Sequence, residues 1–298
     1  MGGDTPGAVR RLKLASSQVS YGGQAVIEGV MMRGPRKTGI AVRKPDGVIV
    51  VSSRDRVQYS KMHPLLGLPV IRGAVSLIDS LVVGVDALMY SANFSLDEGE
   101  KIGKGEMAAT VSFSVVLAVG LFIVAPTLVV SLLKNRLGIG GVALNLFEGA
   151  LRLVILIAYL WTISRFDDIQ RVLAYHGAEH KVINAMERNL DLTVESARGM
   201  SPIHPRCGTS FLLVVAMTSI LLFSFFGWPG IVHRIVTRLL MFPVVAGVSY
   251  EFIRLSGRST SALVRMLAWP GMYLQRFTTR PPDDSMIEVA LKALEAAR

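Results

Sequence analysis

The sequence predicts a mainly α-helical, polytopic membrane protein with about four spans, a small N-terminal β-rich unit and interfacial helices. The 298-residue chain is 51% hydrophobic and has a mean hydropathy of +0.47, which is too apolar for an ordinary soluble protein of this size. Long uncharged runs begin after residue 106, whereas strand-like residues and a Pro-Asp-Gly turn come before residue 62.

The N-terminal region divides into residues 1–20, which we expect to be flexible, and a β-rich cytoplasmic unit at residues 21–61. Within that unit, short apolar runs precede and follow the turn Pro45-Asp46-Gly47, as in a hairpin. About forty residues hold too small a core to fold alone. We therefore expect the unit to dock onto the helices or onto the membrane surface, where its basic residues could meet phosphate.

Residues 62–106 are expected to form a helix followed by a polar loop. Arg72, Asp79 and Asp86 interrupt the apolar sequence at seven-residue intervals, which places them on one helix face. Such a polar stripe favours a helix that lies in the membrane interface or packs on other helices. A fifth span is the alternative.

Residues 107–258 are expected to form a four-span membrane domain, because they contain apolar stretches about as long as a bilayer is thick. Between the second and third spans lies a cytoplasmic loop at residues 166–206, made of a helix and an irregular connection. The expected spans are Met107–Leu133, Leu146–Ile163, Thr209–Trp228 and Leu239–Ile253.

Residues 259–298 are expected to form two C-terminal helices. The first is an amphipathic basic helix over Ser259–Phe277 that is broken at Pro270, because proline cannot donate the backbone hydrogen bond of a helix interior. The second is a surface helix that begins after a capping aspartate, Asp283.

The charge pattern predicts a multi-pass protein of the cell membrane, with both termini in the cytoplasm. No apolar signal-peptide core is visible near the start, and Lys and Arg are more numerous in the segments assigned to the inside. A net charge of +10 makes the lipid bilayer and its anionic head groups the expected partners. Nucleic acid is not expected, because the basic residues are scattered. One cysteine excludes an internal disulfide and agrees with a reducing compartment.

Three of the five histidines and the only cysteine lie within about thirty residues, next to an expected span. His176, Glu179 and His180 are spaced to share one helix face. His204 and Cys207 have the two-residue separation of a ligand pair. Imidazole and thiolate are the ligands that zinc and similar divalent transition metals prefer, so the four residues predict one metal site. A hydrogen-bonded polar network without metal is the alternative.

The number of ligands decides what such a site does. Three ligands leave a position for an activated water, with Glu179 or Glu195 handling protons, whereas four ligands make a structural clamp. The order His-x-x-Glu-His also occurs in inverted zinc proteases, which need a distant carboxylate ligand. Glu251 could supply it, or it could pair with Arg254. A nucleophilic Cys/His pair is a further alternative.

A glycine-rich stretch near the start carries further polar residues that could belong to the same site. Gln24, Glu28 and Arg33 stand among four glycines in an otherwise apolar sequence, and glycines permit close backbone approach. We expect the three side chains to line the site. The alternative is a bulged strand in which Glu28 and Arg33 are solvated or paired.

Four sequence stretches closely resemble the bacterial YqhQ family, a membrane family of unknown function whose members are often labelled as metal-dependent enzymes. The resemblance covers nearly the whole chain and implies that the metal and proton-handling roles apply to His176, Glu179, His180, Glu195, His204 and Cys207. The matching stretches are GGQAVIEGVMMRGP before Arg36, AYHGAEHK at 174–181, LTVE at 192–195 and HPRCGTSF at 204–211.

Together these observations predict a zinc-dependent hydrolase embedded in the membrane, which acts at the cytoplasmic surface on a membrane-associated substrate, either a peptide or a lipid-linked molecule. The alternative is a non-enzymatic membrane scaffold or assembly factor in which zinc closes a structural site.

Overall fold

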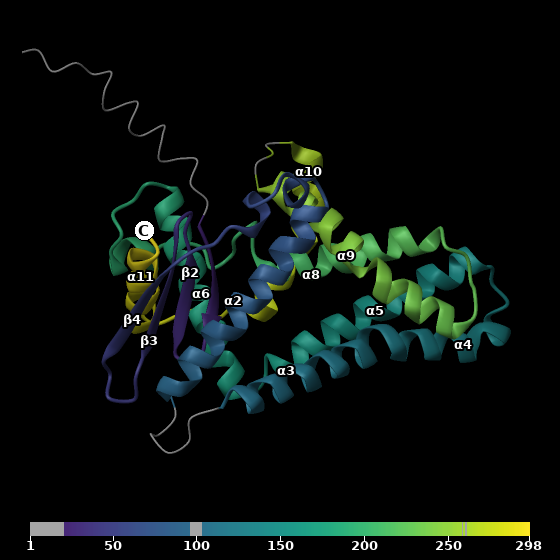
Figure 1. Ribbon diagram of the computed structural model, residues 1–298, viewed down its shortest axis with the longest axis horizontal. Helices are drawn as coiled ribbons and strands as arrows, with labels where there is room; N and C mark the ends of the chain where they lie inside the picture. Colours follow the sequence, from purple (N-terminus) through teal and green to yellow (C-terminus); the bar gives the residue numbers. More distant parts are fainter. Residues whose placement is uncertain (1–20, 96–102, 258, 260) are drawn as a thin grey trace, which may run out of the picture.

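The computed structural model describes residues 21–95, 103–257, 259 and 261–298, and it consists of a sheet-containing part and a helical membrane part (Figure 1). The predicted flexible N-terminus and most of the predicted polar loop lie outside the described residues. The elements are β1 (Gly22–Val26), β2 (Gly29–Arg33), β3 (Lys37–Arg43), β4 (Ile49–Asp55), η1 (Tyr59–Lys61), η2 (Pro64–Gly67), α2 (Ile71–Ser95), α3 (Lys104–Val119), η3 (Gly120–Val124), α4 (Ala125–Leu137), α5 (Gly141–Ile163), α6 (Asp167–Glu187), α7 (Val194–Arg198), α8 (Gly208–Ser224), α9 (Ile231–Ser256), α10 (Ala262–Thr278) and α11 (Asp284–Ala296).

The predicted β-rich unit is confirmed as a four-stranded antiparallel sheet in the order β1-β2-β3-β4. The turn between β3 and β4 has the expected chemistry. Gly47 adopts a φ of 85°, a conformation that favours glycine, and Asp46 Oδ1 accepts a hydrogen bond from the Val48 backbone at 3.0 Å.

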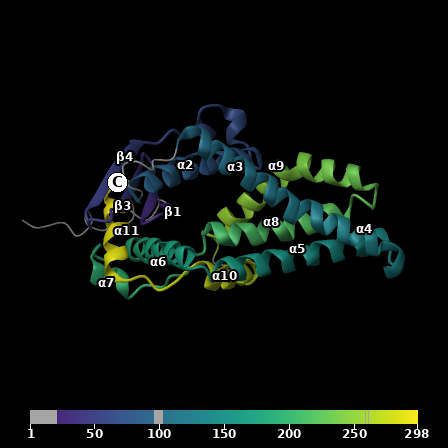
Figure 2. The same cartoon turned by 90° about the horizontal axis from the view of Figure 1, so that it is seen from below.

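Helices cover both faces of this sheet. These helices supply the hydrophobic core that the roughly forty residues of the unit could not form alone. Met31 and Ile40 are buried against α2, whereas their neighbours Val30, Met32 and Ala41 are buried in a cluster with α6 and α11. Strands that are buried on both sides are apolar throughout rather than alternating. Figure 2 shows α2 on one side of the sheet, and α6 and α11 on the other.

Four of the described helical segments are long and apolar enough to cross a membrane, which indicates a membrane protein. They are α2, the continuous run Gly105–Arg136 through α3, η3 and α4, then α5 and α9. Three of the four predicted spans agree with these segments, and the fourth, Thr209–Trp228, corresponds to the shorter apolar helix α8, which ends before Gly227 turns the chain with a φ of 67°. Because the sheet before α2 packs on α6 and α11, these three elements lie on the same side of a membrane. An even number of crossings must therefore separate them, so α3–α4 pairs with α5 and α8 pairs with α9, while α2 packs beside them without crossing.

The seven-residue charge spacing on α2 has a structural explanation. Arg72 pairs with Glu251 on α9, while Asp79 pairs with Arg33 on β2 and Asp86 with Arg54 on β4. The stripe therefore ties α2 to the membrane part at one end and to the sheet along the rest of its length. The expectation of a packed helix with a polar stripe describes this arrangement.

One of the two C-terminal helices differs from expectation. The helix α10 is not broken at Pro270 but continues to Thr278, because a single missing donor removes only one internal hydrogen bond. The helix α11 buries its apolar face, including Ile287, Ala290 and Leu294, fully under the sheet, and exposes Ser285 and Glu295 on its other face. Its cap is as expected, because Asp283 Oδ1 accepts from the Met286 backbone at 2.9 Å.

Candidate metal centre

A cavity of about 690 Å³ lies where the sheet-containing part meets the membrane helices. Its lining comes from β1, α2, α6, α9 and the N-terminal end of α8, and it combines apolar side chains with histidine, cysteine, glutamate and arginine. The size is that of a pocket for a small molecule. The predicted His/Cys residues lie on its wall.

Three of the predicted ligands form a compact group of donor atoms. Donor atoms of His176, His180 and Cys207 all lie within 4.8 Å of one another, and Cys207 Sγ is 3.3 Å from His176 Nε2. The histidines are one turn apart on α6, as the spacing predicted, with ring centroids 4.4 Å apart. Cys207 is the N-cap residue of α8, and its sulfur accepts from the Thr209 backbone at 3.3 Å.

The opposite nitrogen of each ligand histidine is held by the backbone. His176 Nδ1 lies 2.7 Å from the Thr278 carbonyl oxygen, and His180 Nδ1 lies 2.6 Å from that of Pro202. A carbonyl can only accept, so both Nδ1 atoms carry a proton, and in the neutral ring each Nε2 atom presents a lone pair. Metal-binding histidines in proteins are oriented in this way.

The donor set fits zinc or a similar divalent transition metal. Zinc bonds of about 2.0–2.1 Å to nitrogen and 2.3 Å to sulfur put tetrahedral ligands roughly 3.3–3.6 Å apart. The observed 3.3 Å between sulfur and His176 Nε2 is close to this separation, and the three donors, which lie within 4.8 Å of one another, would draw closer around an ion. Two imidazoles and one thiol would leave a fourth position of a tetrahedral ion open.

Glu179 lies beside this group, with its Oε2 atom 3.5 Å from His180 Nε2 and 3.9 Å from His176 Nε2. The side chain is almost fully buried, and burial raises the pKa of Glu179 above its usual range, opposed by His176, His204 and the Gly23 backbone. Gly23 is required here, because a Cβ atom at this position would lie 2.7 Å from Glu179 Cγ.

A second glycine, Gly177, permits another close approach. A Cβ atom at this position would lie 2.2 Å from the carbonyl oxygen of Arg280, so only glycine lets the chain between α10 and α11 cross α6. The Arg280 backbone N–H donates to the Leu173 carbonyl at 2.9 Å in the same crossing. This crossing places the Thr278 carbonyl oxygen within hydrogen-bonding distance of His176 Nδ1.

His204 lies outside the three-residue group, although it is buried and its ring centroid is 5.8 Å from that of His180. Its Nε2 atom is 3.3 Å from Glu187 Oε2, and Arg206 pairs with the same carboxylate. Burial raises the pKa of Glu187, but the hydrogen bond from His204 and the charge of Arg206 outweigh it, so the pKa lies below its usual value.

The structure brings some of the other predicted residues to the cavity and not others. Gln24 and Arg33 line it. Glu28 lies outside its lining, where it pairs with Arg171 and accepts a hydrogen bond from Tyr175 at 3.3 Å. Glu251 is engaged by Arg72, and Glu195 is exposed on the short helix α7.

Several residues that support the site escaped prediction. Gln275 is fully buried and holds the His204 backbone on both sides, since it accepts from the N–H at 2.9 Å and donates to the carbonyl at 2.8 Å. Lys181 and Asn184 on α6 donate to four carbonyls of the segment 198–203. Periodicity could have placed Lys181 and Asn184 on one face with His180, but no local pattern marks Gln275.

Arg56 is a further unpredicted residue of the cavity wall. Its Nη1 atom donates to the Gly34 carbonyl at 2.9 Å, and no carboxylate in the described part of the chain forms an ion pair with it. The Nε atoms of Arg56 and Arg33 are both buried without a hydrogen-bond partner among the described residues. Burial and the neighbouring Arg33 lower the pKa of Arg56.

The fold and the site thus define a helical membrane protein with a His/Cys cluster at the edge of a cavity. A family described as "Protein of unknown function (DUF1385)" matches residues 68–298, and the chain belongs to this family. The chain is also 30% identical over 289 residues to the uncharacterized protein YqhQ of Bacillus subtilis (strain 168), which covers 92% of this chain and 91% of that protein. No solved structure matches the chain significantly.

Proposed function

We propose that this protein is a zinc-dependent hydrolase embedded in the cell membrane, which acts at the cytoplasmic surface on a membrane-associated substrate. The observation that carries the proposal is the three-donor group of His176, His180 and Cys207 on the wall of a cavity of about 690 Å³. A structural metal site is normally closed by four protein ligands, whereas a catalytic site keeps one position for water or substrate.

Three residues would bind the metal ion, and a fourth would transfer a proton. His176 and His180 present their Nε2 atoms and Cys207 its sulfur, and the ion they hold would act as a Lewis acid and acidify a water molecule. Glu179 would hold or release the proton of that water, because its carboxylate lies next to both imidazoles.

The cavity favours a substrate that carries an anionic group, such as a phosphate or a carboxylate. Arg33 and Arg56 line it, and although Asp79 pairs with Arg33, no carboxylate of the described residues pairs with Arg56. The positive charge of Arg56 is therefore available to attract the oxygens of such a group. Apolar residues including Leu77, Phe211 and Ile253 line the same cavity, which suits the apolar portion of a lipid-linked substrate or of a peptide.

We infer the orientation from the distribution of charges. With the site and both termini in the cytoplasm, the basic residues of the chain meet the anionic head groups of the inner leaflet. Head groups would then concentrate next to the cavity entrance. Labelling of a single cysteine placed at an exposed C-terminal position in intact and lysed cells tests this orientation.

The first test of the function is a comparison of two glutamates. Purified protein loaded with zinc is incubated with fractionated membrane lipids and peptides, and mass spectrometry detects hydrolysis products. We expect products with wild type and with Glu195→Gln, whose side chain lies outside the cavity, and their loss with Glu179→Gln while bound zinc is retained. Equal product formation by all three proteins would contradict the role of Glu179.

A structural zinc site in a scaffold is the second candidate, and one observation favours it. The ligand histidines lie on α6 beneath the sheet, whereas Cys207 is at the start of helix α8. One ion bound by all three residues would therefore link the sheet-containing part to the membrane part. This candidate predicts that chelation lowers the unfolding temperature strongly and that Glu179→Gln has no effect on any activity.

A further inference from the structure

A cluster of buried charges lies inside the membrane part, at the far end from the His/Cys group. Glu148 and Arg152 belong to α5, and Arg234 and Arg238 to α9. The exposed fractions of their side chains are 1% for Glu148, 12% for Arg152, 4% for Arg234 and 5% for Arg238. Ionisable residues inside membrane helices are rare and mark functional sites.

One carboxylate serves all three arginines. Glu148 accepts hydrogen bonds from Arg152 at 2.7 Å, from Arg238 at 2.8 Å and from Arg234 at 3.3 Å, and from the Thr127 hydroxyl at 2.8 Å. No other carboxylate of the described residues pairs with these arginines. The cluster therefore holds two positive charges in excess, and arginine stays protonated in proteins.

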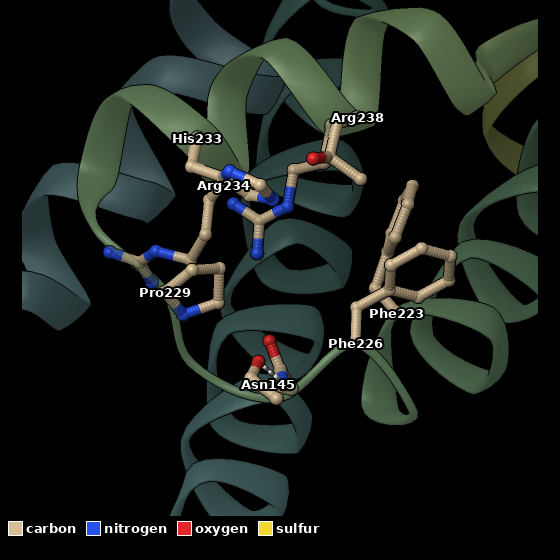
Figure 3. A pocket seen from close by; sticks show the side chains of 9 residues that line it. Asn145, Phe223, Phe226, Pro229, His233, Arg234 and Arg238 are labelled. Atoms are coloured by element: carbon tan, nitrogen blue, oxygen red, sulfur yellow. Dashed lines mark hydrogen bonds between the residues drawn. The ribbon is translucent and has the colours of Figure 1, made fainter.

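Next to the cluster lies a small pocket with a volume of about 20 Å³. In Figure 3, Arg234 and Arg238 lie on one side of this pocket, Phe223 and Phe226 on another, and Asn145 faces them from below. A site of this size holds about one water-sized sphere.

Arg234 lines this pocket in addition to its other contacts. Its guanidinium lies over the Trp228 ring, 3.7 Å from the centroid, and its Nη atoms bind Glu148 and Ser131. Its Nε atom is buried and has no hydrogen-bond partner among the described residues. The positive charge of Arg234 therefore borders the pocket, and the only described carboxylate that balances it is the one shared with Arg152 and Arg238.

We propose that this pocket binds a small inorganic anion of halide size, such as chloride. Excess buried positive charge in an apolar bundle is costly unless it is compensated, and an anion next to Arg234 and Arg238 compensates it. A volume of about 20 Å³ is enough to admit a monatomic ion. The site is separate from the candidate metal centre, because Cys207 and Phe223 stand at opposite ends of α8, roughly 25 Å apart at 1.5 Å per residue.

Thermal unfolding in an uncharged maltoside detergent tests the proposal. At constant sodium concentration, replacing gluconate by chloride or bromide should raise the Tm by about 2–4 °C in a saturable way. Arg234→Gln should lose this increment. The matched control is Arg165→Gln, because Arg165 also stacks over a tryptophan, 4.4 Å from the Trp161 centroid, but is exposed. The control should keep the full increment.

A second pair of variants serves if Arg234→Gln does not fold. Thr237 lines the pocket, so Thr237→Glu should place a tethered carboxylate there, raise the Tm in gluconate and abolish the response to halide. Thr237→Gln adds the same bulk without charge, so it should not raise the Tm in gluconate and should not abolish the response to halide. A Tm that is equal in gluconate and halide would overturn the proposal. Stabilisation by phosphate-bearing lipids but not by halide would also overturn it.

Discussion

The two buried polar clusters of this protein, one beside the sheet and one inside the membrane part, are built from opposite chemistry. Around His176, His180 and Cys207, the hydrogens of the ring nitrogens go to backbone carbonyls and the remaining atoms are lone-pair donors that face one another. Around Glu148, the converging atoms are almost all N–H groups of arginine.

The difference shows what each cluster can bind. Lone pairs that converge without hydrogens between them suit a cation, whereas converging N–H groups with excess positive charge suit an anion. The size of the adjoining space also differs, at about 690 Å³ for the first and about 20 Å³ for the second. Only the first has room for a substrate as well as an ion.

The largest effect is expected from Glu148→Gln. This change leaves three buried arginines without their counter-charge, and we expect it to lower the free energy of unfolding by about 3–5 kcal/mol. The control is Asp86→Asn, which breaks an ion pair that is about half exposed and should cost about 1 kcal/mol or less. Equilibrium unfolding in detergent measures both, and equal losses would show that the membrane cluster is not a buried charge network.

An intermediate effect is expected from Gly23→Ala at the other cluster. The new Cβ atom would lie 2.7 Å from both Glu179 Cγ and the Met31 carbonyl oxygen, so the strand or the carboxylate must move, at a cost of about 1–3 kcal/mol. Gly22→Ala is the matched control, because a Cβ atom there meets nothing within 4 Å. Unfolding measurements on both variants, with zinc content as a second readout, would refute the close approach if the two behave alike.

The smallest change in the free energy of unfolding is expected at Asp283, an exposed charge outside both clusters. It serves as a reference for the effects of the buried charges. Hydrogen bonds from Ser285 and Met286 outweigh burial and lower the pKa of Asp283 below 3.8. Its stabilisation is therefore present above pH 3.8 and is lost as the pH falls through the lowered pKa. Asp283→Ser keeps a cap without the charge, and we expect a loss of roughly 0.5 kcal/mol at neutral pH that vanishes in acid. A loss that is independent of pH would contradict the ionised cap.

Much of the local structure could be predicted because it depends on short-range chemistry. The hairpin at Gly47, the histidine pair on one face of α6 and the cap at Asp283 all follow from neighbouring residues. The partner of α11 could not be predicted, since an amphipathic helix has the same sequence pattern whether it packs on a sheet or on a membrane.

The rest of the site depends on contacts between distant segments, which no local pattern reports. Gln275 reaches His204 across 71 positions, and Thr278 reaches His176 across 102. Glu148 is likewise 86 positions from Arg234 and 90 from Arg238, so the charge network could be anticipated only as the pair Glu148 and Arg152. Which of His204 and Cys207 joins the histidine pair was likewise open until the chain was folded.

Metal content measured by mass spectrometry on protein purified without chelator tests the central claim most directly. The account predicts about one zinc or other transition-metal ion per chain in wild type, and its loss in His176→Ala, His180→Ala and Cys207→Ala. It predicts that His204→Ala keeps the ion, because His204 lies outside the donor group and binds Glu187. Wild-type protein without stoichiometric metal would contradict the account and leave the histidines as a hydrogen-bonded network.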